Sequence, residues 1–158
     1  MSTSENKKTK KSCKILSQEC IGTDIYSMWL DAGEIGKNAV PGQFVSLYSR
    51  NGSKLLPRPI SLCEIDKEEG KLRLVYRVTG KGTGTEEFSR LHAGVPIETM
   101  GPLGNGFPQE GENVFLIGGG IGVPPMLEMA KQLNCEKQII LGYRDENLFL
   151  RDEFEAYG

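Results

Sequence analysis

The stretch YRVTGKGT at residues 76–83 joins a strand-like run to a glycine turn and then to the start of a helix. Thr83 and Glu86 have the spacing of a capping box, which predicts a helix over residues 85–92. Backbone N–H groups at such a start favour a bound anion, for example a pyrophosphate, and Gly82 would let it approach closely. An exposed loop in which Thr83 only caps the helix is the alternative interpretation.

A second stretch, RPIS at residues 58–61, precedes it in the chain. Arg58 supplies a fork of N–H donors suited to phosphate oxygens. Pro59 fixes the backbone, and the Ser61 hydroxyl stands where it could reach a ring nitrogen of a ligand. The same residues would also fit a surface arginine that precedes a proline at the beginning of a strand.

Short apolar runs surround both stretches. We expect strands near residues 13–21, 24–31, 43–48, 59–65, 71–78 and 95–100, because these runs are rich in Val, Ile, Leu, Tyr and Phe and are separated by turn residues. Phe88 and Leu91 have the spacing of a helix face directed at a core. Six short strands interrupted by one helix predict an antiparallel β-barrel or sandwich over residues 13–110.

The pattern changes after Gly111. Residues 114–117 are a continuous apolar run, as expected of a strand that is buried on both faces. A glycine-rich turn follows, and then a helix near 124–133, a second buried strand at 138–142 and a helix near 147–156. This order predicts a parallel α/β sheet, so we interpret residues 111–158 as the first part of a second, Rossmann-like domain.

The glycine-rich turn reads GGGIGVPP at residues 118–125. Pro125 occupies the last position of a G-x-G-x-x-G motif, but the order of strand, glycine turn and helix is the context in which that motif binds a dinucleotide pyrophosphate. We expect the pyrophosphate beside Gly118, Gly119, Gly120 and Gly122. A tight turn with a purely structural role is the alternative.

Composition narrows the classes of function. The formal net charge of −2 gives no general reason to expect nucleic-acid binding, and no apolar run approaches the ~20 residues that cross a bilayer. Residues 1–12 are polar and basic without the apolar segment of a secretory signal, so we expect a disordered tail and a cytoplasmic protein. No pair of cysteines has C-x-x-C spacing, and His92 is the sole histidine, so we expect neither a metal site nor a catalytic side chain.

The three motifs, in this order, resemble the ferredoxin–NADP reductase superfamily, which joins a flavin-binding barrel to a nicotinamide-binding domain. Within it, LPRPIS at 56–61, YRV at 76–78, GKGT at 80–83 and GPLGNGF at 101–107 look like the electron-transfer subunit of class 1B dihydroorotate dehydrogenase. The resemblance extends from about residue 13 to residue 158. It implies that FAD is held by Arg58, Pro59, Ile60, Ser61, Val75, Tyr76, Arg77, Gly82 and Thr83. The wider superfamily often has tyrosine where this chain has Ile60, which offers no hydroxyl.

The resemblance also implies a relay of cofactors. NAD exchanges hydride with FAD, FAD exchanges single electrons with a [2Fe-2S] centre, and an FMN-containing dihydroorotate dehydrogenase catalytic subunit oxidises dihydroorotate in pyrimidine biosynthesis, the two subunits forming a heterotetramer. The family's chains continue past position 158 with the cluster's cysteines. We therefore expect this chain to be C-terminally truncated, with an open strand edge near residues 138–142.

Two alternatives stay open. The chain would also suit a related flavin reductase subunit of a sulfite reductase, a hydrogenase or an NADH-dependent ferredoxin:NADP oxidoreductase complex. It would otherwise be a flavin-binding assembly module with no turnover of its own. The sequence does not decide between NADH and NADPH.

Overall fold

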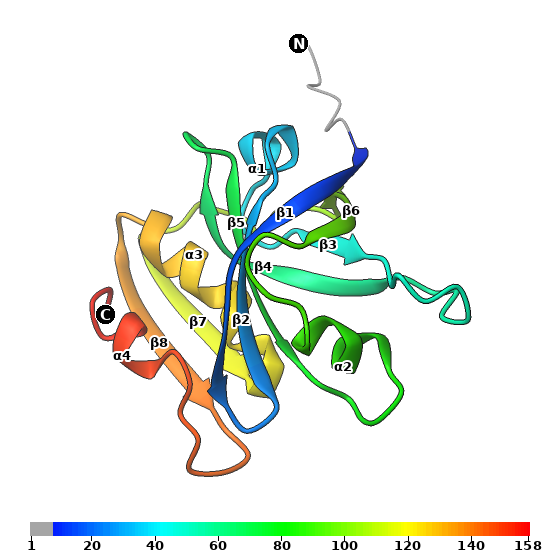
Figure 1. The fold of residues 1–158 in the computed structure, drawn as a ribbon. Coiled ribbons are helices and arrows are strands. Elements are labelled where there is room, and N and C mark those ends of the chain that lie inside the picture. The colour runs from blue at the N-terminus through cyan, green and yellow to red at the C-terminus, as the bar shows by residue number, and fades with distance from the viewer. Residues whose placement is uncertain (1–7) are drawn as a thin grey trace.

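The computed structural model describes residues 8–158, which form a closed barrel and a two-stranded sheet beside it (Figure 1). The elements are β1 Thr9–Gly22, β2 Ile25–Asp31, α1 Glu34–Asn38, β3 Phe44–Leu47, β4 Arg58–Asp66, β5 Lys71–Arg77, α2 Gly84–Ser89, β6 Pro96–Leu103, β7 Asn113–Gly119, the 3₁₀ turn η1 Gly120–Gly122, α3 Pro124–Gln132, β8 Glu136–Gly142 and α4 Arg151–Phe154. None of the helices within residues 8–158 has the length and apolar character needed to span a membrane.

The barrel has the strand order β1-β2-β5-β4-β3-β6, and every pairing is antiparallel. The first and last strands close it, because β1 pairs with β6. Closure gives every strand two neighbours, which removes the unpaired edges that an open sheet exposes. The predicted antiparallel barrel followed by a parallel sheet is confirmed.

The first strand begins earlier than expected. Thr9 pairs with Gly101 and Ser12 pairs with Glu98, so residues 9–12 belong to the barrel and their assignment to a disordered tail is wrong. The Nζ atom of Lys10 also lies 4.0 Å from the centroid of the Tyr48 ring, a cation–π contact that a count of charges does not reveal. Residues 1–7, the rest of the expected tail, lie outside the described residues.

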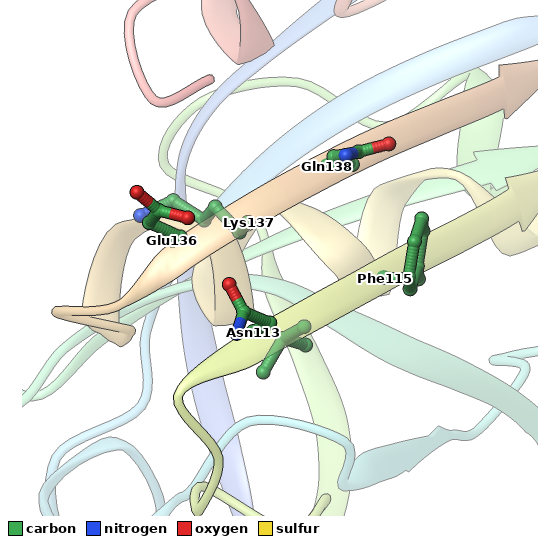
Figure 2. Close-up of a pocket in the computed structure, with 6 residues that line it drawn as sticks. Asn113, Phe115, Glu136, Lys137 and Gln138 are labelled. Atoms are coloured by element: carbon green, nitrogen blue, oxygen red, sulfur yellow. The ribbon is translucent and has the colours of Figure 1, made fainter.

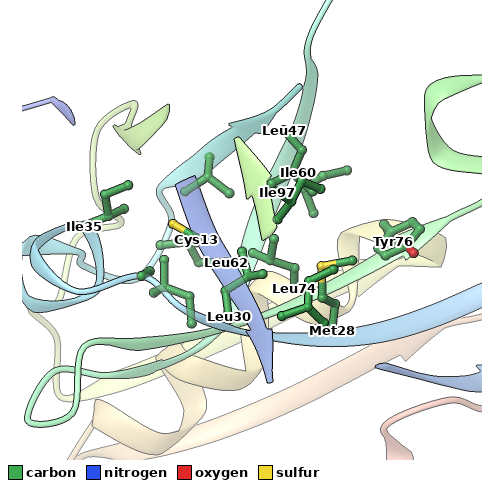
Figure 3. Close-up of a cluster of buried hydrophobic side chains, with 14 of the residues drawn as sticks. Cys13, Met28, Leu30, Ile35, Leu47, Ile60, Leu62, Leu74, Tyr76 and Ile97 are labelled. Carbon is green, nitrogen blue, oxygen red and sulfur yellow. The ribbon is translucent and has the colours of Figure 1, made fainter. Parts of the chain in front are cut away.

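The barrel interior is packed with side chains from opposite strands. Met28, Leu30, Leu62 and Leu74 are fully buried and meet between the strands in Figure 3. At one end of the barrel, the fully buried Phe88 of α2 packs against this cluster, and Leu91 packs beside it as predicted.

A second core lies between the barrel and the parallel sheet. Val75 and Cys63, on the outer surface of the barrel, are buried in one cluster with Val123 and with Leu127 of α3. Helix α3 packs on β4 and also on β7. Ile25 joins this cluster, so β2 is covered on both faces, which explains why its apolar alternation is only partial.

The two strands of the parallel sheet are not buried on both faces, and that expectation is wrong. Leu116 faces the second core, whereas Phe115 and Ile117 on the opposite face are 62% and 67% exposed, and Ile140 of β8 is 50% exposed. Helices α3 and α4 cover one face, and within residues 8–158 no element covers the other. β8 pairs only with β7, so its open edge agrees with the prediction.

The helices differ from expectation in three places. α2 ends at Ser89, three residues before the end of the helix predicted over residues 85–92. The short α1 was not predicted, because its five residues are too few to show a helical period. The helix expected over residues 147–156 is reduced to α4, because Leu150 directly before it adopts a left-handed backbone with φ 66°.

Candidate functional site

β4 and β5 separate beside α2, and this separation creates the main candidate site. Their pairing runs from Asp66 opposite Lys71 to Leu62 opposite Leu74 and then stops. Beyond that point residues 58–61 pair with β3, while residues 75–77 pair with β2. A pocket of about 300 Å³ lies in the gap, between two strand segments that are not paired with each other.

This pocket brings together the RPIS motif and the first residues of the YRVTGKGT motif, whereas the predicted site residues Gly82 and Thr83 do not line it. It is lined by Arg58, Pro59, Ile60, Ser61, Val75, Tyr76, Arg77, Thr79, Thr85 and Ile121. Ile121 belongs to the glycine-rich turn, so the second unit also reaches the pocket, through a side chain that the glycine pattern did not single out. Thr79 and Thr85 were missed as well, although their closeness to Gly82 was the signal that could have found them.

Arg58 has a buried hydrogen-bond donor that none of the described residues satisfies. Its Nε atom is buried, and it has no hydrogen-bond acceptor among the residues that the structure describes. The side chain lies against Gly84, where a Cβ atom would come within 3.2 Å of Nε, so any larger residue at this position would crowd the guanidinium. A buried donor without an acceptor is costly. The site therefore fits an anionic ligand that would accept from Arg58.

Threonines fix the loop between β5 and α2. The Thr79 N–H donates to Thr85 Oγ1 at 3.0 Å, and the two hydroxyl oxygens lie 3.1 Å apart. Thr83 is the N-cap of α2: its hydroxyl accepts from the Glu86 N–H at 3.3 Å and donates to the Gly80 carbonyl at 2.7 Å. These contacts hold the loop beside the pocket in one shape, and the predicted cap at Thr83 is confirmed.

Gly82 matters to the loop through its backbone conformation, and its N–H is not a free hydrogen-bond donor. Its φ of 75° is strained for any residue with a side chain, and a Cβ built at this position would have no heavy atom within 4 Å. Its N–H donates to the carboxylate of Glu86, and this hydrogen bond lowers the pKa of Glu86. The N–H group that was expected to face an anion is therefore engaged by the protein's own carboxylate.

Tyr76 offers the pocket no free hydroxyl. Its O–H donates to Gln18 Oε1 at 2.7 Å, and its ring stacks on Tyr26 with centroids 5.9 Å apart. Burial raises the pKa of Tyr76, so the phenol stays protonated. Val75 and Ile60 are also buried, in the second core and in the barrel core respectively, whereas Ser61 is exposed. The walls therefore consist of backbone edges and apolar groups with a few polar atoms.

The glycine-rich turn follows the carboxyl end of β7, the position at which parallel sheets bind nucleotides. A Cβ atom at Gly118 would lie 3.0 Å from the Gly122 carbonyl oxygen, so packing requires glycine there. At Gly119, Gly120 and Gly122 a Cβ would meet no heavy atom within 4 Å, and Gly120 has φ 54°. The turn thus presents an open glycine surface.

Another hollow of about 300 Å³ lies on the parallel sheet and contains none of the predicted site residues. Figure 2 shows Asn113 and Glu136 at the beginnings of the two strands, with Phe115 and Gln138 further along. These are the amino ends of β7 and β8, opposite the glycine turn. Because nucleotides bind at carboxyl ends, we assign no nucleotide to this hollow.

Among the described residues outside this pocket, metal-ligand groups and thiols offer no competing site. Within residues 8–158 no three His, Cys, Asp or Glu side chains converge as metal ligands, and the four cysteines form no disulfide. Burial raises the pKa of the Cys63 thiol, which makes it a poor nucleophile. His92 is exposed, and its Nδ1 lies 3.1 Å from the Ala93 carbonyl oxygen. The pocket between β4 and β5 therefore remains the principal candidate site.

Two curated proteins and one solved structure are similar to this chain. The electron transfer subunit of dihydroorotate dehydrogenase B (NAD(+)) from Lysinibacillus sphaericus is 41% identical over 154 residues, which cover 92% of this chain and 59% of that protein. The subunit of the same name from Streptococcus thermophilus is 42% identical over 152 residues, covering 91% and 58%. A solved NADH-dependent reduced ferredoxin-NADP oxidoreductase, described for flavin-based electron bifurcation, is 31% identical with a TM-score of 0.81, covering 92% of this chain and 54% of that one.

The chain spans less than two thirds of the length of these relatives. Residues 12–107, which include all six barrel strands except the first residues of β1, match the family described as Oxidoreductase FAD-binding domain. That match extends over more than half of the chain and contains the pocket residues of β4 and β5. The chain therefore belongs to the oxidoreductase FAD-binding domain family.

Proposed function

We propose that this chain binds FAD, with the flavin ring in the gap between β4 and β5 and a phosphate on Arg58. The observation that carries the proposal is the buried Nε of Arg58, which has no acceptor among the described residues although it lines this pocket. A diphosphate supplies the charge-assisted partner that this group lacks.

The strand edges suit the ring half of the cofactor. Residues 58–61 and 75–77 lie on either side of the gap without pairing to each other, so their backbone groups there can bond to ring nitrogens and oxygens. The Ser61 hydroxyl adds a further donor and acceptor. Bound FAD supplies the redox chemistry, and the chain supplies position and shielding from water, with no side chain acting as acid or base.

We assign the FAD-binding domain to residues 13–110, extended at its start to Thr9, and the first part of a nicotinamide-binding domain to residues 111–158. The open surface at Gly119, Gly120 and Gly122, together with the packing requirement at Gly118, supports a dinucleotide pyrophosphate beside the turn. Ile121, which lines the flavin pocket, brings this turn close to the proposed flavin.

For the whole protein we infer an electron-transfer subunit that connects NAD to an FMN-containing dihydroorotate dehydrogenase catalytic subunit. The names of the relatives from Lysinibacillus sphaericus and Streptococcus thermophilus support this inference. A [2Fe-2S] centre would belong to the part of those relatives that this chain does not span, since residues 8–158 contain no group of metal ligands.

Titration with FAD and riboflavin tests the proposal. Arg58→Ala should weaken FAD binding by about 1.5–3 kcal/mol and leave riboflavin binding nearly unchanged, because the guanidinium contacts phosphate rather than the ring. Arg50→Ala is the matched control, since Arg50 is exposed and does not line the pocket. Equal losses for both ligands would show that the phosphate does not lie on Arg58, and absence of flavin binding by the wild-type chain would refute the proposal.

A second candidate is the flavin subunit of another electron-transfer complex. The structural likeness to the NADH-dependent reduced ferredoxin-NADP oxidoreductase favours it secondarily. Purification with native partners separates the two: co-purification of a dihydroorotate-oxidising flavoprotein supports the first candidate, and co-purification of a different oxidoreductase supports the second.

A further inference from the structure

Ile121 is the residue through which the second unit reaches the proposed flavin pocket. Of the ten described residues that line this pocket, nine lie within positions 58–85, in β4, in β5 or between β5 and α2 and at the start of α2, and the tenth is Ile121 of η1. The Ile121 side chain is 43% exposed although it is large and apolar. An apolar side chain left exposed in the wall of a pocket is typical of a ligand contact.

The exposure of Ile121 does not come from a loosely packed turn. Two residues further on, Val123 is fully buried in the second core, and its N–H donates to the Gly120 carbonyl at 3.1 Å. At the start of the turn, a Cβ atom at Gly118 would lie 3.0 Å from the Gly122 carbonyl oxygen, so the backbone is closely packed there too. Because both ends of the turn are fixed, a ligand that contacts Ile121 orders little further structure.

The pocket and the second core share a wall. Val75 of β5 lines the pocket and is also buried in the same cluster as Val123, and β5 packs beside η1. Together with Ile60 of β4, which is 8% exposed, Val75 and Ile121 give the pocket apolar side chains from three separate elements. The flat faces of a flavin ring are largely apolar and suit such a wall.

We propose that the flavin site is completed by the second unit: Ile121 contacts the flavin ring, and binding of the ring therefore strengthens the docking of the glycine turn and its sheet on the barrel. A ligand that contacts both units binds the docked form more tightly than the undocked form, so it shifts the chain toward the docked form. The proposal rests on the proposed function, because it takes the gap between β4 and β5 as the place of the ring.

The first part of the test compares two flavins that share the ring. Ile121→Ala should weaken FAD and riboflavin binding equally, by about five- to tenfold, because the lost apolar contact is with the ring that both contain. Arg58→Ala should by contrast weaken FAD alone. Ile121→Leu, which keeps the apolar volume, should bind both flavins within about threefold of wild type. Ile140→Ala is the control, since Ile140 is 50% exposed on β8 and does not line the pocket.

The second part measures docking directly, by hydrogen exchange with mass spectrometry on peptides from β7 and β8. Riboflavin at saturation should slow exchange in these peptides of the wild-type chain, because the docked form is favoured. At equal occupancy it should slow them much less in Ile121→Ala. Ile121 belongs to neither hydrophobic core, so the variant should keep the wild-type far-UV circular dichroism and urea midpoint without ligand.

Three outcomes would overturn the proposal. The first is affinity of Ile121→Ala for both flavins within about twofold of wild type. The second is a loss for FAD alone, which would place Ile121 beside the phosphates. The third is exchange in β7 and β8 that bound riboflavin leaves unchanged in the wild-type chain, which would confine the flavin site to the barrel. Failure of the wild-type chain to bind either flavin would instead refute the proposed function.

Discussion

The barrel and the parallel sheet beside it differ in how their strand edges and apolar faces are covered. In the barrel, β1 closes on β6, and the side chains that point inward are buried by other barrel strands. In the sheet, β7 and β8 each have one free edge, and one face exposes Phe115 and Ile117. The barrel is therefore a self-contained unit, whereas the covered face of the sheet lies under α3 and α4, and α3 in turn packs on β4 of the barrel.

Polar contacts join the two units where α3 and α4 meet β4 and β5, a region called the junction below. Glu128 of α3 is 3% exposed, and its carboxylate accepts from the Ile65 N–H of β4 at 2.9 Å. Arg73 of β5 donates to Ser27 Oγ at 2.9 Å, to Glu64 at 2.7 Å and to Glu153 of α4 at 2.5 Å. Buried groups from both units satisfy each other here, which fixes how the sheet sits on the barrel.

The largest difference between the two units should appear on truncating their cores. Leu74→Ala in the barrel should lower the free energy of unfolding by about 2–5 kcal/mol and unfold the whole chain in one transition. Leu127→Ala in the second core should instead allow the sheet to unfold first while the barrel persists. Urea titrations followed by Trp29 fluorescence and by far-UV circular dichroism distinguish these outcomes. A single coincident transition in Leu127→Ala would mean that the units are not separable.

Removing the junction arginine should have the next largest effect. Arg73→Met should cost about 3 kcal/mol, at the low end for breaking a buried ion pair, because Glu64 retains Lys131 at 2.9 Å. Arg151→Met, which removes an exposed ion pair between Arg151 of α4 and Glu155 directly after that helix, should cost less than about 0.5 kcal/mol. The midpoint of urea unfolding measures both. Similar losses in the two variants would show that the junction network adds no stability.

Acid should weaken the junction in a predictable direction. Burial acts to raise the pKa of Glu64, but hydrogen bonds from Lys131 and Arg73 outweigh it and lower the pKa below its usual value. The ion pairs of Glu64 with Lys131 and Arg73 therefore stabilise the fold fully above the unfolded pKa of about 4.3. This stabilisation is lost as the pH falls through the lower pKa that Glu64 has in the folded chain. Glu64→Gln should flatten the decline in stability below about pH 4.3, measured by urea unfolding across the pH series. If Glu64→Gln loses stability with falling pH as steeply as the wild type, other carboxylates cause the loss.

The smallest change in stability should come from a substitution on the exposed face of β7, and a substitution on its covered face provides the matched comparison. Ile117→Thr on the exposed face should change stability by no more than about 0.5 kcal/mol. It should also reduce self-association, because it interrupts an exposed apolar surface beside an open edge. Leu116→Ala, one residue away on the covered face, should cost about 2–3 kcal/mol. Sedimentation velocity and urea unfolding check both variants. An Ile117→Thr loss equal to that of Leu116→Ala would mean that the face is covered in solution.

The candidate site was predicted from sequence to the extent that local chemistry defines it. The RPIS stretch, the strand after it and the Thr83 cap each depend on nearby residues, and they line or adjoin one pocket. The separation of β4 and β5 beyond Leu62 and Leu74 was not predictable from sequence, because pairing partners depend on the whole barrel. Ile121 was missed for the same reason.

The sequence by itself determined the strands, the capped helix and the order of a barrel before a parallel sheet, because periodicity, turn residues and caps act over a few neighbouring positions. Tertiary structure alone decided that the lysine-rich start of β1 closes the barrel and that the Tyr76 hydroxyl is engaged by Gln18. It alone decided that Phe115 faces outward while Leu116 is covered. These outcomes depend on which surface lies opposite a residue, and an apolar run is the same in sequence whether one of its faces or both are covered.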